Sequence, residues 1–256
     1  MRTRLSHGRI GESVVCLLLL ALLTIPAPHA ARAQSTGDAA AEIVYIDPAG
    51  VVRVRDPLPA AGSGIAWFSP VGGYVIAVLL DVNGDADMEI AAVRAVSGVY
   101  SLDIYDPVIT TGPIAPGQSV GGVPWALLTS IPLAAPVGVI GVGNLDSATP
   151  GDEILLSARV PASGTGSSTR YKQSFSYLRN AGDQDGKYWQ AIGLPISSED
   201  WTSVALGDMT GDGIDEIGLV ASRPGTLTTW QMRGPSDVVR VFKNETDSRP
   251  WLNLAM

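Results

Sequence analysis

The sequence predicts an all-β protein made of repeated strand–loop–strand units, and three observations point to this fold class. Only 16% of the 256 residues are charged, and 29 glycines and 18 prolines are typical of a chain with many turns. Short apolar runs rich in Val, Ile and Leu are bounded by turn residues, and no helical periodicity is convincing beyond the N-terminus. An oxygen-rich loop between two apolar runs recurs along the chain.

Residues 1–33 have the three parts of a secretory signal peptide. A basic start precedes an apolar run, residues 14–25, which is too short to span a bilayer comfortably. The small-x-small sequence at 31–33 fits a cleavage site. A short membrane anchor is the alternative, and we favour the cleaved signal. We therefore expect a secreted or cell-surface protein without a stable membrane span, which begins with a flexible lead over residues 34–41.

Loss of this segment would remove four of the 17 basic residues and one of the 25 acidic residues, leaving a net charge of −11. Such a chain repels nucleic-acid phosphates and attracts cations. The single cysteine, Cys16, and both histidines, His7 and His29, lie in the signal. The mature chain is thus expected to lack disulfides, typical zinc ligands and histidine-dependent catalysis.

The first oxygen-rich loop, loop one, carries oxygen side chains at alternate positions from Asp81 to Glu89, and Gly84 lets its backbone turn sharply. Six to eight close oxygens are what Ca²⁺ requires, and we expect this ion rather than Mg²⁺, which demands strict octahedral geometry. The flanking runs 74–80 and 90–93 read as buried strands. The expected ligands are Asp81, Asn83, Asp85, the main-chain carbonyl of Asp87, and Glu89.

Two later segments repeat this unit. Loop three offers Asp208, Thr210, Asp212, the carbonyl of Ile214, and Glu216, and the adjacent Asp215 is expected to add only charge. Loop two has one extra residue and lacks the carboxylate at position 5, so its weak candidates are Asn144, Asp146 and Glu153. We expect loop two to keep the turn and to have lost tight metal binding. In all three loops the alternative is that Asp and Asn only form side-chain-to-backbone turns.

An EF-hand shares the first five loop positions, but it needs flanking helices and a glutamate at position 12. Position 12 is Ala92 in loop one and Leu219 in loop three, and the flanks read as strands, so this motif is excluded.

The oxygen-rich loops and four tryptophans recur along the sequence with nearly the same spacing. The loops begin at Asp81, Asn144 and Asp208, which are 63 and 64 residues apart. Trp67, Trp125, Trp189 and Trp251 are 58, 64 and 62 residues apart. A unit of about 60 residues with four strands fits a blade of a β-propeller. We expect a propeller-like array of about three full blades plus one partial: a partial blade (42–70) without its loop-bearing first strand, then blade one (74–128), blade two (137–192) and blade three (202–254).

The loops resemble the calcium-binding loops of FG-GAP (VCBS-type) repeats, which build the integrin α-subunit propeller and many secreted bacterial propellers. Residues 208–217 match that pattern with Thr210 at the third position, and in loop one Ala86 replaces the second glycine. The resemblance implies calcium binding and an adhesion or surface-recognition role for residues 42–256. The family usually has seven blades. A fragment of a longer protein, an unusual four-bladed ring, and open edges that pair with another chain all remain open.

The sequence favours a secreted, calcium-binding propeller that acts as a non-enzymatic binding or scaffold module for an extracellular protein or carbohydrate. Three tyrosines could contribute to a ligand surface if they are exposed, although a tyrosine in a strand is more often a core residue: Tyr171, Tyr177 and Tyr188. The alternative is a fragment or accessory domain of a secreted hydrolase or polysaccharide lyase. Such an enzyme needs two facing carboxylates in a pocket. The candidates from sequence are Glu199 with Asp200 and Asp183 with Asp185, and the latter read as a solvated turn.

Overall fold

The computed structural model describes residues 43–55, 65–84, 88–107, 125–163, 170–181, 189–196, 199–221 and 226–244. The predicted signal peptide and flexible lead lie outside these ranges, as do Asp85, Asp87 and Trp251. Within them the chain forms fifteen strands and no helix. The strands are β1 (Ile43–Ile46), β2 (Val52–Arg55), β3 (Ile65–Phe68), β4 (Tyr74–Leu80), β5 (Glu89–Val96), β6 (Val99–Pro107), β7 (Trp125–Leu133), β8 (Val137–Gly143), β9 (Glu153–Ser163), β10 (Arg170–Asn180), β11 (Trp189–Leu194), β12 (Trp201–Gly207), β13 (Glu216–Ala221), β14 (Leu227–Gly234) and β15 (Asp237–Asn244).

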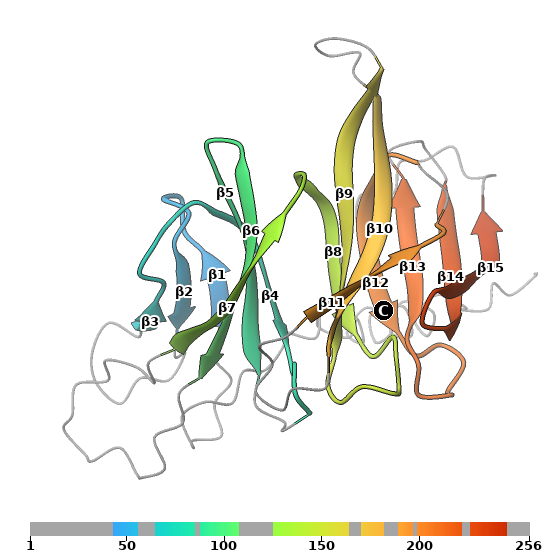
Figure 1. Ribbon diagram of the computed structural model, residues 1–256, viewed down its shortest axis with the longest axis horizontal. Helices are drawn as coiled ribbons and strands as arrows, with labels where there is room; N and C mark the ends of the chain where they lie inside the picture. Colours follow the sequence, from blue (N-terminus) through green and yellow to red (C-terminus); the bar gives the residue numbers. More distant parts are fainter. Residues whose placement is uncertain are drawn as a thin grey trace, which may run out of the picture. The chain divides into compact units, whose positions relative to one another are not determined.

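These strands form four antiparallel sheets (Figure 1), and neighbours along the chain are neighbours in each sheet. Strands β1–β3 make the partial blade, β4–β7 blade one, β8–β11 blade two and β12–β15 blade three. The expected all-β, propeller-like array of about three full blades plus one partial is confirmed. In blade three the fourth strand begins at Asp237 rather than at a tryptophan, and Trp251 lies outside the described residues.

The tryptophan period reflects position in the sheet. Trp67, Trp125 and Trp189 lie on β3, β7 and β11, the last strand of the partial blade, blade one and blade two. Trp67 packs edge-on against Tyr105, with ring centroids 5.1 Å apart. Their shared position is therefore the last strand of a sheet, as the spacing predicted, while Trp67 and Trp125 pack in one core and Trp189 packs in the next.

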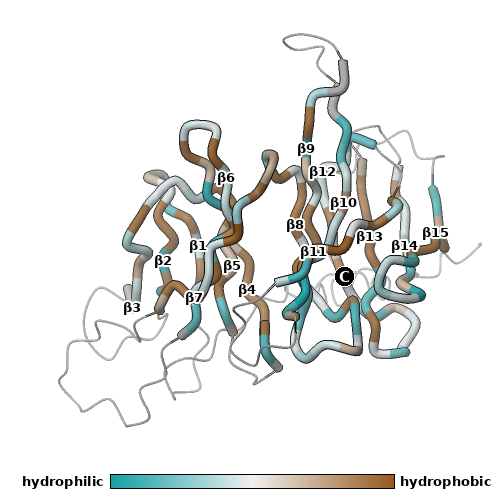
Figure 2. The backbone as a smooth tube through the Cα atoms, viewed as in Figure 1, coloured by the Kyte–Doolittle hydropathy of each residue, from teal (hydrophilic) through white to brown (hydrophobic). Residues whose placement is uncertain are grey.

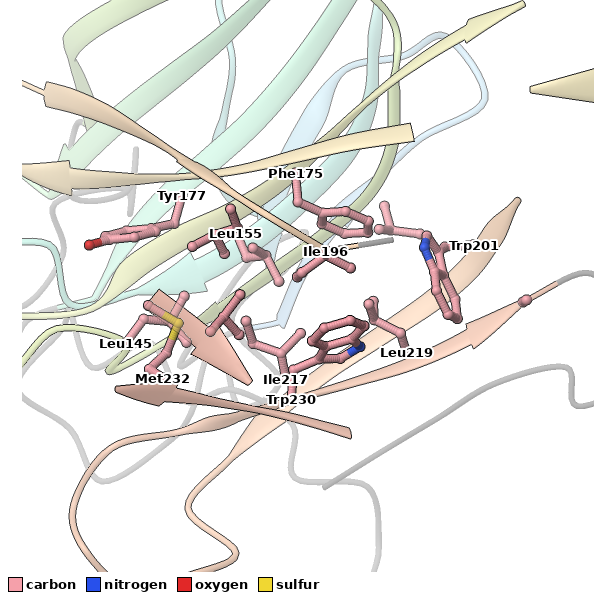
Figure 3. Packing of buried hydrophobic residues seen from close by; sticks show 14 residues of the cluster. Leu145, Leu155, Phe175, Tyr177, Ile196, Trp201, Ile217, Leu219, Trp230 and Met232 are labelled. Carbon is pink, nitrogen blue, oxygen red and sulfur yellow. The ribbon is translucent and has the colours of Figure 1, made fainter. Parts of the chain in front are cut away.

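Three apolar cores join successive blades, because the middle strands are buried on both faces. The residues Glu89–Val93 of β5 and the whole of β13 are buried, and Figure 2 shows hydrophobic residues along β8 and β13. Figure 3 shows the core between blades two and three, where Leu155 and Phe175 face Leu219 and Trp230. The other two cores join the partial blade to blade one and blade one to blade two. Each sheet thus depends on its neighbours for burial of apolar area.

Candidate metal loops and the clasp between blades

The three oxygen-rich loops each join the first strand of a blade to its second strand. Each closes on a glutamate, Glu89, Glu153 or Glu216, which opens the second strand and is only 1% exposed. Each glutamate accepts the main-chain N–H at the second loop position, at distances of 2.7–2.8 Å. The donors are Val82, Leu145 and Met209. The glutamate at the end of each loop therefore holds the loop backbone in place, whether or not it also binds a metal.

Loop one is described in part. Asp81 Oδ1 accepts the N–H groups of Gly84 at 2.7 Å and Asn83 at 3.3 Å, which forms the turn. Gly84 has φ of +77°, a conformation that glycine adopts without steric cost. Asp85 and Asp87, two of the five expected ligands, lie outside the described residues.

Loop three is described in full, and its first side chain organises the turn. Asp208 Oδ1 accepts the N–H of Gly211 at 2.6 Å, and Asp208 Oδ2 accepts the N–H of Gly213 at 2.8 Å. These bonds, led by that from Gly213, lower the pKa of the exposed Asp208 carboxyl. Asp212 Oδ1 accepts the N–H of Ile214 at 2.9 Å, and the Thr210 hydroxyl donates to Glu216 Oε1 at 3.2 Å.

The donor set of loop three suits a hard cation in its chemistry. Asp208, Thr210 and Asp212 present exposed oxygens, and the buried Glu216 adds a carboxylate behind them. The carboxylates nevertheless turn toward loop amides rather than toward one point. Over the described ranges, which omit Asp85 and Asp87, no three His, Cys, Asp or Glu side chains gather closely enough to hold a metal ion. A cation at this loop would therefore exchange some of these amide bonds for metal ligation.

Loop two uses its polar groups for internal bonds instead. Arg179 Nη1 lies 2.6 Å from Asp146 Oδ2, so this carboxylate already has a cationic partner on β10. Glu153 accepts the N–H groups of Leu145 and Asp146 through one oxygen and the Thr149 hydroxyl through the other. An ion bound to Asp146 would have to displace the guanidinium of Arg179.

Burial dominates the electrostatics of loop two. It raises the pKa of Glu153 to about 7, against the hydrogen bonds from Thr149 and two amides, which favour the charged form. Burial likewise raises the pKa of the Tyr177 phenol to about 12, and the negative charge of Asp146 adds to this. Tyr177 is fully buried, so it is a core residue, the usual place of a tyrosine in a strand, and it forms no part of a ligand surface. The side chains of Tyr171 and Tyr188 lie outside the described residues.

Reciprocal hydrogen bonds join each loop to the next, and we call each such pair of bonds a clasp. The Asp152 N–H donates to the Asp81 carbonyl at 2.6 Å, and the Asp81 N–H donates to Asp152 Oδ2 at 3.2 Å. Asp215 and Asn144 make the same two bonds at 2.7 Å and 3.0 Å. Each clasp ties the first residue of one loop to the residue before the glutamate of the next.

The clasp residues were missed by the sequence analysis. Asp215 was expected to add only charge, yet it bonds both main-chain groups of Asn144. Burial raises the pKa of Asp152 and of Asp215, so each carboxylate is held at some electrostatic cost. The available signal was the repeated Asp-Glu-Ile, at 152–154 and 215–217. Loop one has Met88 at the equivalent position, and Met88 packs into the core shared with the partial blade.

Of the carboxylates considered for catalysis, Asp200 Oδ1 pairs with Arg159 Nη2 at 3.0 Å. Asp183 and Asp185 lie outside the described residues.

No model of a known protein family matches the chain, and comparison with curated proteins finds no match. In the part of the chain that the structure describes, no helix has the length and apolar character needed to cross a membrane.

Proposed function

We propose that this protein is an exported, calcium-binding β-propeller module of the FG-GAP type that serves as a rigid, non-enzymatic scaffold for binding an extracellular protein or carbohydrate. The observation that carries the proposal is loop three. There, exposed oxygens of Asp208, Thr210 and Asp212 surround a turn that closes on the buried Glu216. The same strand–loop–strand geometry recurs in blade one, which carries the other complete ligand pattern.

In this proposal calcium binds in the loop that joins the first two strands of a blade, close to the contact with the next blade. The first residue of loop one is also a clasp residue, so an ion held there would stiffen the contact between blades one and two. Loop two is assigned no ion, because Arg179 supplies positive charge at Asp146. Loop two is therefore expected to be held by its own side chains, and loops one and three by calcium.

The test is a thermal melt of the mature chain with calcium and with excess chelator. A ligand at 100 times its dissociation constant adds about 2.7 kcal/mol per site to the free energy of unfolding. We expect Asp81→Ala and Asp208→Ala together to abolish most of the calcium-dependent shift in Tm. Asp237→Ala, which removes an exposed carboxylate outside the loops, is the matched control and should keep the shift. An identical Tm in calcium and in chelator would exclude the calcium role.

A further inference from the structure

We propose that Asn83 is a site of spontaneous covalent modification, and that one of the two products weakens the clasp between blades one and two. Asparagine loses its side-chain amide most readily where a glycine follows, because glycine has no Cβ to hinder attack by its main-chain nitrogen. Of the five asparagines in the sequence, only Asn83 precedes a glycine. Calcium has no part in this reaction, which needs only water.

The reaction exchanges the side-chain amide of Asn83 for a carboxylate and releases ammonia. The Gly84 main-chain nitrogen gives up its proton to solvent hydroxide and attacks Asn83 Cγ. The Cγ–Nδ2 bond then breaks, water returns a proton to the departing nitrogen, and ammonia leaves a succinimide ring. Water opens that ring on either side. Cleavage at Cγ gives aspartate, and cleavage at the main-chain carbonyl gives isoaspartate, whose main chain contains an additional methylene.

The structure leaves this pair of residues open to the reaction. Gly84 is exposed, lies outside any strand and has φ of +77°. Its N–H donates to Asp81 Oδ1 at 2.7 Å rather than to a neighbouring strand, so no sheet holds the attacking nitrogen. That bond opposes loss of the proton, because a negative acceptor stabilises the protonated form of its donor. We therefore expect the Asp81 carboxylate to slow the reaction.

Two other asparagines are held more firmly and are not followed by glycine. Asn144 has both main-chain groups in a clasp, and its Nδ2 donates to the Gly213 carbonyl at 2.6 Å. Asn180, at the end of β10, is only 1% exposed. Asn83 should therefore react before either of them.

The isoaspartate product would lengthen the main chain where loop one meets loop two. A Cβ built at Gly151 would lie 2.7 Å from Asn83 N, so the two main chains nearly touch. Asp81 Oδ1 accepts the N–H groups of Asn83 and Gly84, and the additional methylene would stand between these two donors. The Asp81 carbonyl, in turn, accepts the clasp N–H from Asp152. Isoaspartate should therefore loosen the turn and the clasp, whereas aspartate keeps the main chain unchanged.

The experiment incubates the chain at neutral pH, well below its Tm, in excess chelator and in water enriched in heavy oxygen. Peptide mass spectrometry follows label entering residue 83, and chromatography separates the aspartate and isoaspartate forms. Asp81→Ala should convert about fivefold faster or more, because a hydrogen bond to a charged acceptor is lost. Asp237→Ala is the matched control and should convert at the rate of the unaltered chain.

A chain that stays unmodified at Asn83 while a free peptide of residues 79–91 converts would overturn the site. Equal rates for Asp81→Ala and Asp237→Ala would overturn the restraint by the Asp81 carboxylate. Both measurements are made without calcium, so they stand apart from the calcium-dependent shift in Tm that tests the proposed function.

The effect on the clasp is measured by thermal melts in chelator. The isoaspartate fraction should melt below the unaltered chain and below Asn83→Asp, which supplies the other product. Asn83→Gln, whose longer side chain closes a ring much more slowly, should keep its Tm during the incubation. In Asp152→Ala, which already lacks the clasp carboxylate, isoaspartate should lower Tm by less, and an equal loss in both backgrounds would overturn the link to the clasp.

Discussion

Asp215 of blade three holds Asn144 of blade two by both of its main-chain groups: the Asp215 N–H donates to the Asn144 carbonyl at 2.7 Å, and the Asn144 N–H donates to Asp215 Oδ2 at 3.0 Å. Asn144 Nδ2 also donates to the Gly213 carbonyl at 2.6 Å. In addition to the apolar core between them, these blades are therefore linked at loops two and three. Residues of the oxygen-rich loops therefore also make the contacts between neighbouring blades.

Removal of the clasp carboxylate should destabilise the protein without calcium. Asp215→Ala leaves the part-buried Asn144 N–H without its acceptor, which costs about 1–3 kcal/mol in the free energy of unfolding. Asp215→Asn keeps an oxygen acceptor and should cost clearly less, because the carboxylate charge is itself disfavoured by burial. Urea unfolding in chelator measures both values. Equal losses for the two variants would show that charge, rather than the hydrogen bond, matters here.

The close approach of loops one and two should make Gly151 intolerant of a side chain. Gly151 has φ of +79°, and an added Cβ would fall on the Asp81 carbonyl and within 2.7 Å of Asn83 N. Gly151→Ala therefore combines left-handed strain, about 1–2 kcal/mol, with a backbone clash. Gly98→Ala is the control, because Gly98 has φ of +80° and open space around it. We expect a lower Tm for Gly151→Ala than for Gly98→Ala, and equal Tm values would contradict the contact.

Arg179 should be essential to loop two even though it lies on another strand. Its Nη1 pairs with Asp146, and its Nε and Nη2 both donate to Gln190 Oε1 at 3.0 Å and 2.8 Å. Arg179→Met leaves a largely buried carboxylate without its cationic partner, and we expect a loss of about 1–3 kcal/mol. A double-mutant cycle with Asp146→Asn isolates the pair. A coupling energy near zero would show that the pair contributes nothing.

Glu153 should make the stability depend on pH. Its pKa of about 7 in the folded protein lies above its ordinary value of 4.5, so the folded state binds the proton more tightly. The stability contributed by this group is fully present below about pH 4.5 and is lost as pH rises through about 7. Glu153→Gln keeps an oxygen for the two loop amides and should remove that decline. Chemical unfolding between pH 4.5 and 8 measures it, and a variant with the wild-type pH profile would refute the assignment.

Much of the fold followed from local patterns. The apolar run 74–80 predicted β4 with its observed bounds, because short β-branched runs between turn residues favour buried strands. The tryptophan spacing located the last strands of the partial blade and of blades one and two. The expectation that loop two does not bind metal tightly also came from a local feature, its missing carboxylate at position 5. Calcium binding at loops one and three stays a prediction.

The sequence by itself determined the repeat, the strands and the identity of the loop oxygens, because these depend on neighbouring residues and on period. Only the tertiary structure decided which of those oxygens bond within the chain. Arg179 is 33 residues from Asp146, and each clasp spans 71 residues. Contacts at such separations depend on how sheets pack, and the repeated Asp-Glu-Ile marks the clasp aspartates without showing what they contact. The aspartate that looked like surplus charge therefore turned out to join two blades.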